Sequence, residues 1–85
     1  MTSERRPRLI LYSRSYCHLC QDMLTALDAM RGELGFDFEV IDVDSDQGAL
    51  ARYDELVPVI EGDGRELCHY FLDEAKVREY VTQFR

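Results

Sequence analysis

Two cysteines three residues apart, Cys17 and Cys20, are the side chains of this chain best suited to chemistry. They lie where an apolar run, residues 9–12, gives way to a helical pattern of apolar residues. At the start of a helix, the first cysteine lies near the positive end of the helix dipole, and the second lies one turn further on. Such a pair can open and close a disulfide bond. The spacing therefore predicts a redox-active dithiol.

The two cysteines are expected to have different roles. Cys17 is the candidate nucleophile, because the helix N-terminus, Arg14 and a charged His18 all lower the pKa of its thiol. Asp22 acts in the opposite direction, and the net expectation is a lowered pKa. Cys20, which is expected to be more buried, is the candidate resolving thiol that attacks the mixed disulfide and releases the reduced partner.

The elements that position this pair follow from hydrophobic periodicity. Residues 8–12 are apolar on both faces, which is typical of a strand in a parallel sheet covered by helices. Residues 17–34 form an amphipathic helix with Gly35 as a left-handed stop, and residues 36–43 alternate as a second strand. A strand, a helix and a strand predict a right-handed crossover with the two strands parallel.

The next segment predicts a short helix and a third strand. Asp44 or Ser45 can cap the helix, since both side chains accept hydrogen bonds from the first turn. Residues 56–60 form the third strand, with Pro58 near its start. Proline is tolerated there because it need not donate to the ladder.

The C-terminal part predicts a hairpin and a last helix. Residues 61–64 have the composition of a hairpin turn, and residues 65–70 return as an antiparallel fourth strand. Asp73 caps the helix, and Leu72 and Val77 are placed to pack as a hydrophobic staple. The inner face of this helix is expected to comprise Val77, Tyr80, Val81 and Phe84. The order β-α-β-α-β-β-α predicts an α/β domain with a four-stranded mixed sheet flanked by helices.

Length and composition predict one small domain, residues 1–85, with residues 1–7 as a flexible tail. Seventeen acidic against ten basic residues give a net charge of −7, which argues against a nucleic acid or an anionic membrane as partner. No apolar segment is long enough for a signal peptide or a membrane span. A cytoplasmic monomer is therefore expected, and in that compartment a close cysteine pair is more often catalytic or metal-binding than structural.

Two motifs resemble known proteins. Residues 12–20, Tyr-Ser-Arg-Ser-Tyr-Cys-His-Leu-Cys, resemble the active-site loop of glutaredoxins, and Val57-Pro58 is similar to the cis-proline segment of the same superfamily. The element order resembles the thioredoxin fold. The resemblance implies a thioredoxin-like fold and a thiol–disulfide oxidoreductase that needs no metal or organic cofactor. By the same resemblance, the residues expected to contact substrate are Arg14, Tyr16, His18, Val57 and Pro58.

The resemblance also implies a substrate geometry. A cis bond at Pro58 would turn the Val57 backbone outward, where it can pair with an extended substrate segment. Residues 68–71, Cys-His-Tyr-Phe, stand where glutaredoxins carry a glycine pair and an aspartate that hold glutathione, and His18 replaces a usual proline. The expected partners are protein or small-molecule disulfides and a cellular reductant. Glutathione is one candidate reductant, although its usual binding residues are only partly present.

A second class of function stays open, a non-catalytic interaction module or redox sensor that presents the Pro58 edge to a partner. Tyr12, Tyr16 and Tyr70 can ring the site as a contact surface or lie in the core, and the sequence leaves both alternatives open.

A third alternative is a metal site. Cys17, Cys20, Cys68 and His69 have the ligand chemistry of zinc or, shared between subunits, of an iron–sulfur cluster. Adjacent residues on a strand point to opposite faces, so Cys68 and His69 are not expected to reach one ion together. No metal is therefore predicted, and Cys68 is interpreted as a core residue or a non-catalytic thiol.

Overall fold

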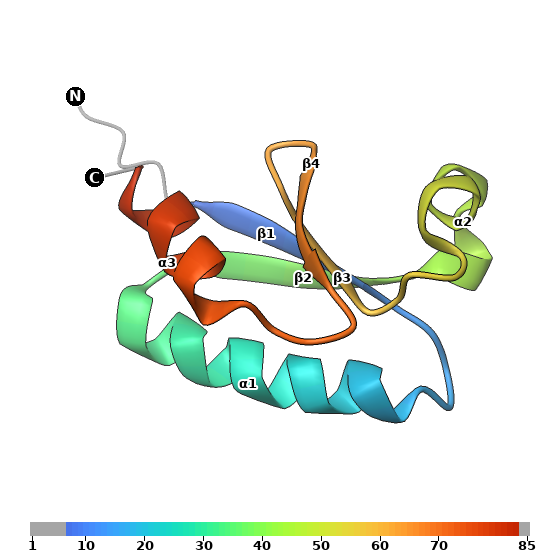
Figure 1. Ribbon diagram of the computed structural model, residues 1–85, viewed down its shortest axis with the longest axis horizontal. Helices are drawn as coiled ribbons and strands as arrows, with labels where there is room; N and C mark the ends of the chain where they lie inside the picture. The colour runs from blue at the N-terminus through green and yellow to red at the C-terminus, as the bar shows by residue number, and fades with distance from the viewer. Residues whose placement is uncertain (1–6, 84–85) are drawn as a thin grey trace.

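The computed structural model describes residues 7–83, which form a four-stranded β-sheet with helices on both faces (Figure 1). The strands are β1 (Arg8–Ser13), β2 (Asp37–Asp42), β3 (Val59–Gly62) and β4 (Arg65–His69). The helices are α1 (His18–Leu34), the 3₁₀ turn η1 (Val43–Ser45), α2 (Gln47–Tyr53) and α3 (Glu74–Thr82). The strand order is β2-β1-β3-β4, with β1 parallel to β2 and antiparallel to β3. The predicted element order and the mixed sheet are confirmed.

Helix α1 begins and ends where the sequence predicts. The side chain of Cys17 caps its first turn, and Gly35 ends it in the left-handed conformation, with φ at 77°. The Gly35 N–H donates to the Arg31 carbonyl at 2.9 Å, as a left-handed helix stop requires. The buried face of the helix comprises Cys20, Met23, Leu27 and Met30. None of the helices within residues 7–83, α1 included, combines the length and the apolar character needed to cross a membrane.

Strand β1 lies inside the sheet, and its side chains alternate between two cores. Leu9 and Leu11 pack with α1 and α3, whereas Tyr12 packs with η1 and α2 on the opposite face. The larger core comprises Leu9, Leu11, Met23, Leu27, Met30, Phe36, Ile60, Val77, Tyr80 and Val81. The sheet therefore separates an α1 face from an α2 face (Figure 1).

The hairpin between β3 and β4 and the start of α3 agree with the sequence. Asp63 and Gly64 both have positive φ, 55° and 77°, which is the conformation that two-residue hairpin turns favour. The Asp73 side chain accepts a hydrogen bond from the Lys76 N–H at 3.1 Å and caps α3. Leu72 packs against the core that contains Val77, on the side expected for the staple.

Strand β3 is displaced along the chain from the predicted residues 56–60, and it includes Glu61 and Gly62, which were predicted to belong to the hairpin turn. It begins at Val59 rather than at Leu56, because Pro58 has no N–H to donate to the ladder. Leu56 and Val57 instead pack against the core on the α2 face. The segment before β3 is therefore loop, and it leads into the strand beside β1.

The cap of α2 was assigned to the wrong residue. Asp46 caps this helix, accepting from the Ala49 N–H at 3.0 Å. Asp44 and Ser45 belong to η1, where the Asp44 N–H donates to the side chain of Asp42 at 2.9 Å. One additional short turn therefore separates β2 from α2.

Pro7, the last residue of the predicted flexible tail, is held by the fold. Pro7 is buried, and its carbonyl accepts a hydrogen bond from the Asp37 N–H at 3.0 Å, so the chain is already fixed at this residue. The rest of the predicted tail, residues 1–6, lies outside the described residues, as does Phe84 of the last helix.

Candidate active site

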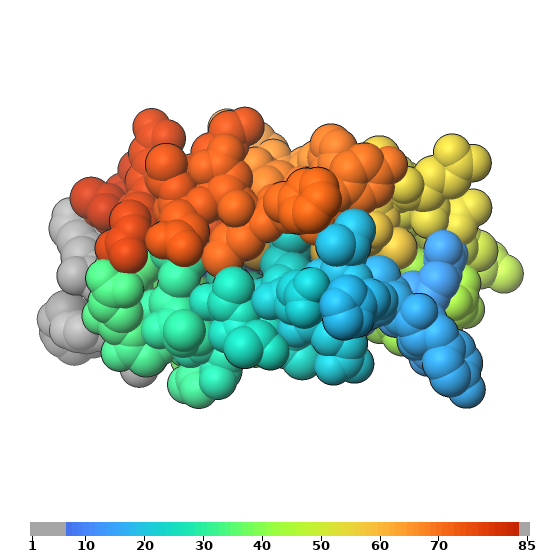
Figure 2. Space-filling view, turned by 60° about the horizontal axis from the view of Figure 1, so that its bottom comes forward, coloured from blue at the N-terminus to red at the C-terminus, as the bar shows by residue number. Residues whose placement is uncertain are grey.

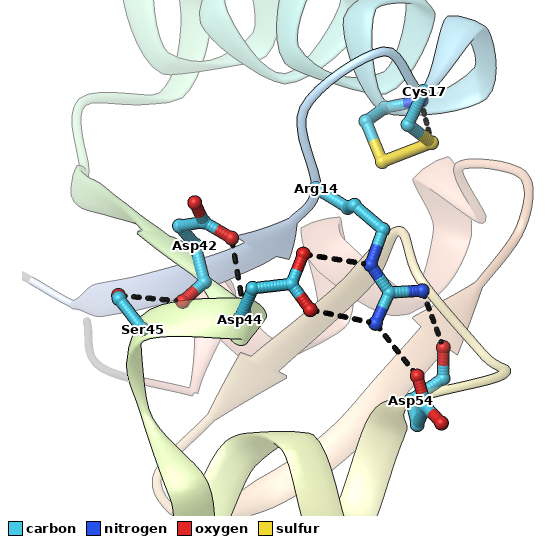
Figure 3. Close-up of polar contacts among 7 residues, drawn as sticks. Arg14, Cys17, Asp42, Asp44, Ser45 and Asp54 are labelled. Carbon is cyan, nitrogen blue, oxygen red and sulfur yellow. Dashed lines mark hydrogen bonds and ion pairs between the residues drawn. A yellow bond between two sulfur atoms is a disulfide. The ribbon is translucent and has the colours of Figure 1, made fainter.

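Cys17 and Cys20 are joined by a disulfide bond at the N-terminus of α1 (Figure 3). Their Cα atoms are 5.2 Å apart, which is an ordinary separation for a disulfide. Cys17 is also the N-cap of the helix, since its Sγ accepts a hydrogen bond from the Cys20 N–H at 3.1 Å. The pairing that the sequence predicts is present, at the helix end where it was expected.

The two sulfur-bearing residues differ in exposure. Cys20 is 4% exposed, whereas Cys17 is only half-buried. A partner approaching from solvent therefore meets Cys17 first. The N–H of Cys20 and the positive end of α1 are directed toward Cys17 Sγ, and both stabilise negative charge on that atom.

Arg14 has a structural role in the folded chain, and its contact with substrate stays a prediction. Its guanidinium donates two hydrogen bonds of 3.1 Å to the Asp44 carboxylate and one of 2.6 Å to the Asp54 carboxylate (Figure 3). A further bond of 3.0 Å reaches the Asp54 carbonyl. These carboxylates balance the charge of Arg14 and raise its pKa. Arg14 therefore ties the loop before Cys17 to η1 and to the end of α2.

Removing Arg14 is expected to loosen both segments that it joins. In Arg14→Gln, amide hydrogen exchange should become faster in residues 13–16 and 54–56, because the neutral side chain cannot bridge Asp44 and Asp54. Hydrogen-exchange mass spectrometry measures this directly. Arg78→Gln is the matched control, since Arg78 also makes a two-bond ion pair, with Glu33, but away from the site. Equal exchange in the wild-type protein and Arg14→Gln would contradict the structural role.

Tyr16 and His18, also predicted to contact substrate, flank Cys17 and point into solvent. Tyr16 is fully exposed and adopts a positive φ of 61°. The His18 side chain is 89% exposed, and its Nε2 lies 3.6 Å from a carboxylate oxygen of Asp22. Both side chains are accessible to a partner of Cys17, and their contact with substrate stays a prediction.

The Val57–Pro58 peptide bond is cis, as predicted from the resemblance. Pro58 is buried, and its carbonyl accepts a hydrogen bond from the Tyr70 N–H at 2.8 Å. Because Val59 pairs with Tyr12 in antiparallel register, Pro58 and Val57 lie beside the loop that leads from β1 to Cys17. The Val57 backbone makes no hydrogen bond to any residue within 7–83. Its pairing with an extended substrate segment stays a prediction.

A groove beside the cysteines was not found from the sequence. It has a volume of about 200 Å³ and lies between the N-terminal half of α1 and the segment after β4 (Figure 2). Its lining residues are Leu19, Asp22, Met23, Ala26, Tyr70, Phe71 and Leu72. The sequence signal that could have revealed it is the bulky pair Tyr70-Phe71 directly after a strand. Tyr70 thus borders the site, one of the two alternatives that the sequence left open.

Tyr12, by contrast, is a core residue, which is the other alternative that the sequence left open for the tyrosines. It is 5% exposed, and its ring packs against that of Tyr53 with centroids 5.1 Å apart. This contact lies on the α2 face, opposite the groove. Tyr12 therefore does not belong to the surface around the cysteines.

A buried acidic cluster on the α2 face was also missed. Glu61 is 5% exposed and accepts hydrogen bonds from Tyr53 Oη at 2.6 Å and from Tyr12 Oη at 3.4 Å. Arg52 Nη1 lies 3.4 Å from the same carboxylate. Burial raises the pKa of Tyr53 to about 12, and the neighbouring Glu61 adds to this effect. The cluster holds α2 against the sheet.

Cys68 is a core thiol, as interpreted from the sequence. It packs against the larger core, and its Sγ accepts a hydrogen bond from the Asp73 N–H at 3.5 Å. Burial raises the pKa of this thiol. His69 pairs instead with Glu66. Within the described part of the chain, no three His, Cys, Asp or Glu side chains gather where they could hold a metal ion.

The fold and the cysteine pair together define a class of protein. A thioredoxin from Fasciola hepatica superposes with a TM-score of 0.61 at 24% identity, covering 94% of this chain and 82% of the thioredoxin. The structure is therefore a thioredoxin fold, with a disulfide at the N-terminus of its first helix. The family model described as "Glutaredoxin-like domain (DUF836)" matches residues 8–82. The chain belongs to this glutaredoxin-like family.

Two more similar proteins extend this comparison. An uncharacterized protein of Mycobacterium tuberculosis is 35% identical over 83 residues, which covers 92% of this chain and 86% of the relative. The solution structure of protein Ne2328 from Nitrosomonas europaea has a TM-score of 0.83 at 32% identity, covering 95% of this chain and 98% of that one. Membership of this family, together with the Cys17–Cys20 pair, supports a redox-type function.

Proposed function

We propose that this protein is a thiol–disulfide oxidoreductase that uses Cys17 and Cys20 in reversible disulfide exchange. The observation that carries the proposal is the asymmetric pair at the start of α1: a half-buried N-cap cysteine is joined to a buried one. This is the arrangement needed for a first cysteine that meets substrate and a second that completes the exchange.

The exchange takes two steps. In the reduced protein, the Cys17 thiolate attacks one sulfur of a substrate disulfide, and the other substrate sulfur leaves as a thiolate. The Cys20 thiol then loses its proton and attacks Cys17 Sγ, which forms the Cys17–Cys20 disulfide and releases the second substrate thiolate. Two electrons pass from the dithiol to the substrate. The reverse sequence oxidises a substrate dithiol.

The position of Cys17 at the helix end supports both the reduction of a substrate disulfide and the oxidation of a substrate dithiol. In the reduced protein, the Cys20 N–H and the helix dipole both favour the thiolate form of Cys17, which is the form that attacks a disulfide. The same stabilisation makes Cys17 a better leaving group when a mixed disulfide is resolved. These residues perform the exchange without a metal or an organic cofactor. A cellular reductant, in the cytoplasm, returns the pair to the dithiol.

The reduction potential of the pair tests the proposal. The protein is equilibrated in dithiothreitol and glutathione redox buffers, alkylated and weighed by mass spectrometry, with Cys68→Ala as the control that removes the third thiol. We expect a reversible two-electron couple between about −270 and −120 mV, the range of thiol–disulfide oxidoreductases. A potential far below about −300 mV is that of a structural disulfide, and it would favour the interaction module instead.

A further inference from the structure

The groove beside the disulfide is apolar over most of its surface. Leu19, which contributes one wall, lies between the two cysteines in the sequence, so the groove lies next to the residues of the site. Met23 and Ala26 continue this wall along α1. The opposite wall comes from Tyr70, Phe71 and Leu72. When a substrate disulfide reacts at Cys17, the substrate side chain next to that disulfide can therefore reach an apolar surface.

The wall formed after β4 is held in place before any partner arrives. The Tyr70 N–H donates to the Pro58 carbonyl at 2.8 Å, and its hydroxyl donates to the Glu55 carbonyl at 2.9 Å. Leu72 packs against the larger core. Between them, Phe71 is 69% exposed. An exposed phenyl ring on a fixed wall is available to bury against a partner, and little ordering entropy is lost when it does so.

The charge of the groove is acidic. Asp22 is the one charged residue among its lining side chains. The basic groups close to these residues already face carboxylates: His18 faces Asp22, His69, whose ring packs against Tyr70, pairs with Glu66, and Arg14 is balanced by two carboxylates. A carboxylate on a substrate would therefore meet no counter-charge in the groove, whereas a basic group would meet Asp22.

We propose that the groove binds a large apolar side chain next to the disulfide of an extended polypeptide, with Asp22 favouring a basic residue beside it. This inference rests on the proposed function and names its substrate class. The polypeptide backbone would pair with Val57, whose N–H and C=O make no bond within residues 7–83. Glutathione is a poor fit, because it brings carboxylates and no large apolar side chain.

The test uses the reduced full-length protein and four peptide disulfides of equal length. Each is a symmetric dimer in which the cysteine is flanked by phenylalanine or alanine on one side and by lysine or glutamate on the other. Oxidised glutathione is the fifth substrate. Single-turnover rates are followed by chromatography of the released thiol. We expect the phenylalanine peptides to react about tenfold faster than the alanine peptides, equivalent to about 1.4 kcal/mol. Lysine should exceed glutamate by about twofold, since the pair with Asp22 is exposed.

Two variants with matched controls locate the effect. Phe71→Ser should reduce the phenylalanine-to-alanine rate ratio toward one, whereas Val40→Ser, at an exposed apolar residue of β2 outside the groove, should leave the ratio unchanged. Asp22→Asn should remove the lysine-to-glutamate preference, whereas Asp28→Asn, further along α1 and paired with Arg31, should retain it. Because each readout is a ratio of rates, a change in the amount of folded protein does not affect it.

The outcomes separate this inference from the proposed function. Equal rates for all peptides, or a ratio lost in Val40→Ser rather than in Phe71→Ser, would overturn the substrate class and leave disulfide exchange intact. Oxidised glutathione reacting faster than every peptide would do the same. If no disulfide is reduced at all, the proposed function fails, and the inference fails with it.

Discussion

Replacing Cys17 with serine is expected to lower the rate of disulfide exchange at least about a thousandfold, because a hydroxyl cannot form the mixed disulfide that starts the reaction. Cys20→Ser retains the attacking thiol and loses only the step that releases the partner. It should therefore accumulate covalent adducts with its substrates. Reduction of a peptide disulfide measures the first effect, and mass spectrometry under non-reducing conditions measures the second.

Cys68→Ala is the control for both variants, since Cys68 packs against the core and takes no part in the exchange. It should keep the wild-type rate and trap nothing. Loss of exchange in Cys20→Ser without any adduct would contradict the assignment of roles. Adducts at Cys20 in the Cys17→Ser variant would reverse it.

Removing the buried carboxylate of Glu61 is expected to lower the free energy of unfolding by about 2–4 kcal/mol. Glu61→Ala leaves two tyrosine hydroxyls and Arg52 without the acceptor that they share. Small domains have a total stability of roughly 5–15 kcal/mol, so this loss is a large part of it. Urea unfolding followed by circular dichroism gives the difference.

The two tyrosines provide an internal comparison for the Glu61 cluster. The bond from Tyr53 to Glu61 is 2.6 Å long, and that from Tyr12 is 3.4 Å. Tyr53→Phe should therefore cost about 1–2 kcal/mol and Tyr12→Phe about 0.5 kcal/mol or less. Disulfide exchange should be unaffected in both, because the cluster lies on the α2 face. Equal costs for the two variants would show that the shorter bond is not the stronger one.

The fold was largely predictable because its elements carry local signals. The apolar spacing of α1, the Gly35 stop and the Asp63-Gly64 turn each specify backbone conformation within a few residues. The differences between prediction and structure lie at element boundaries, where a single chemical group determines the residue at which the element begins. Pro58 delays the start of β3 because it lacks an N–H, and Asp46 caps α2 because the preceding residues form an additional turn.

The candidate site was only partly predictable, and the reason is sequence separation. The spacing of Cys17 and Cys20 is local, so the pair was visible. The partners of Arg14 are 30 and 40 residues away, and nothing in the sequence marks Asp44 and Asp54 among the many acidic residues. The groove likewise joins α1 to residues 70–72, which come together only in the folded chain.

The cap of α1 has an evolutionary consequence. Cys17 Sγ closes the first turn of the longest helix of the described structure and is also the atom proposed to exchange with substrates. Serine, a far better capping residue than cysteine at this position, would hold the turn more firmly while removing the thiol. A more stable helix would therefore favour serine at this position, whereas disulfide exchange requires cysteine. The cysteine at this position is therefore explained by its reactivity rather than by the helix that it begins.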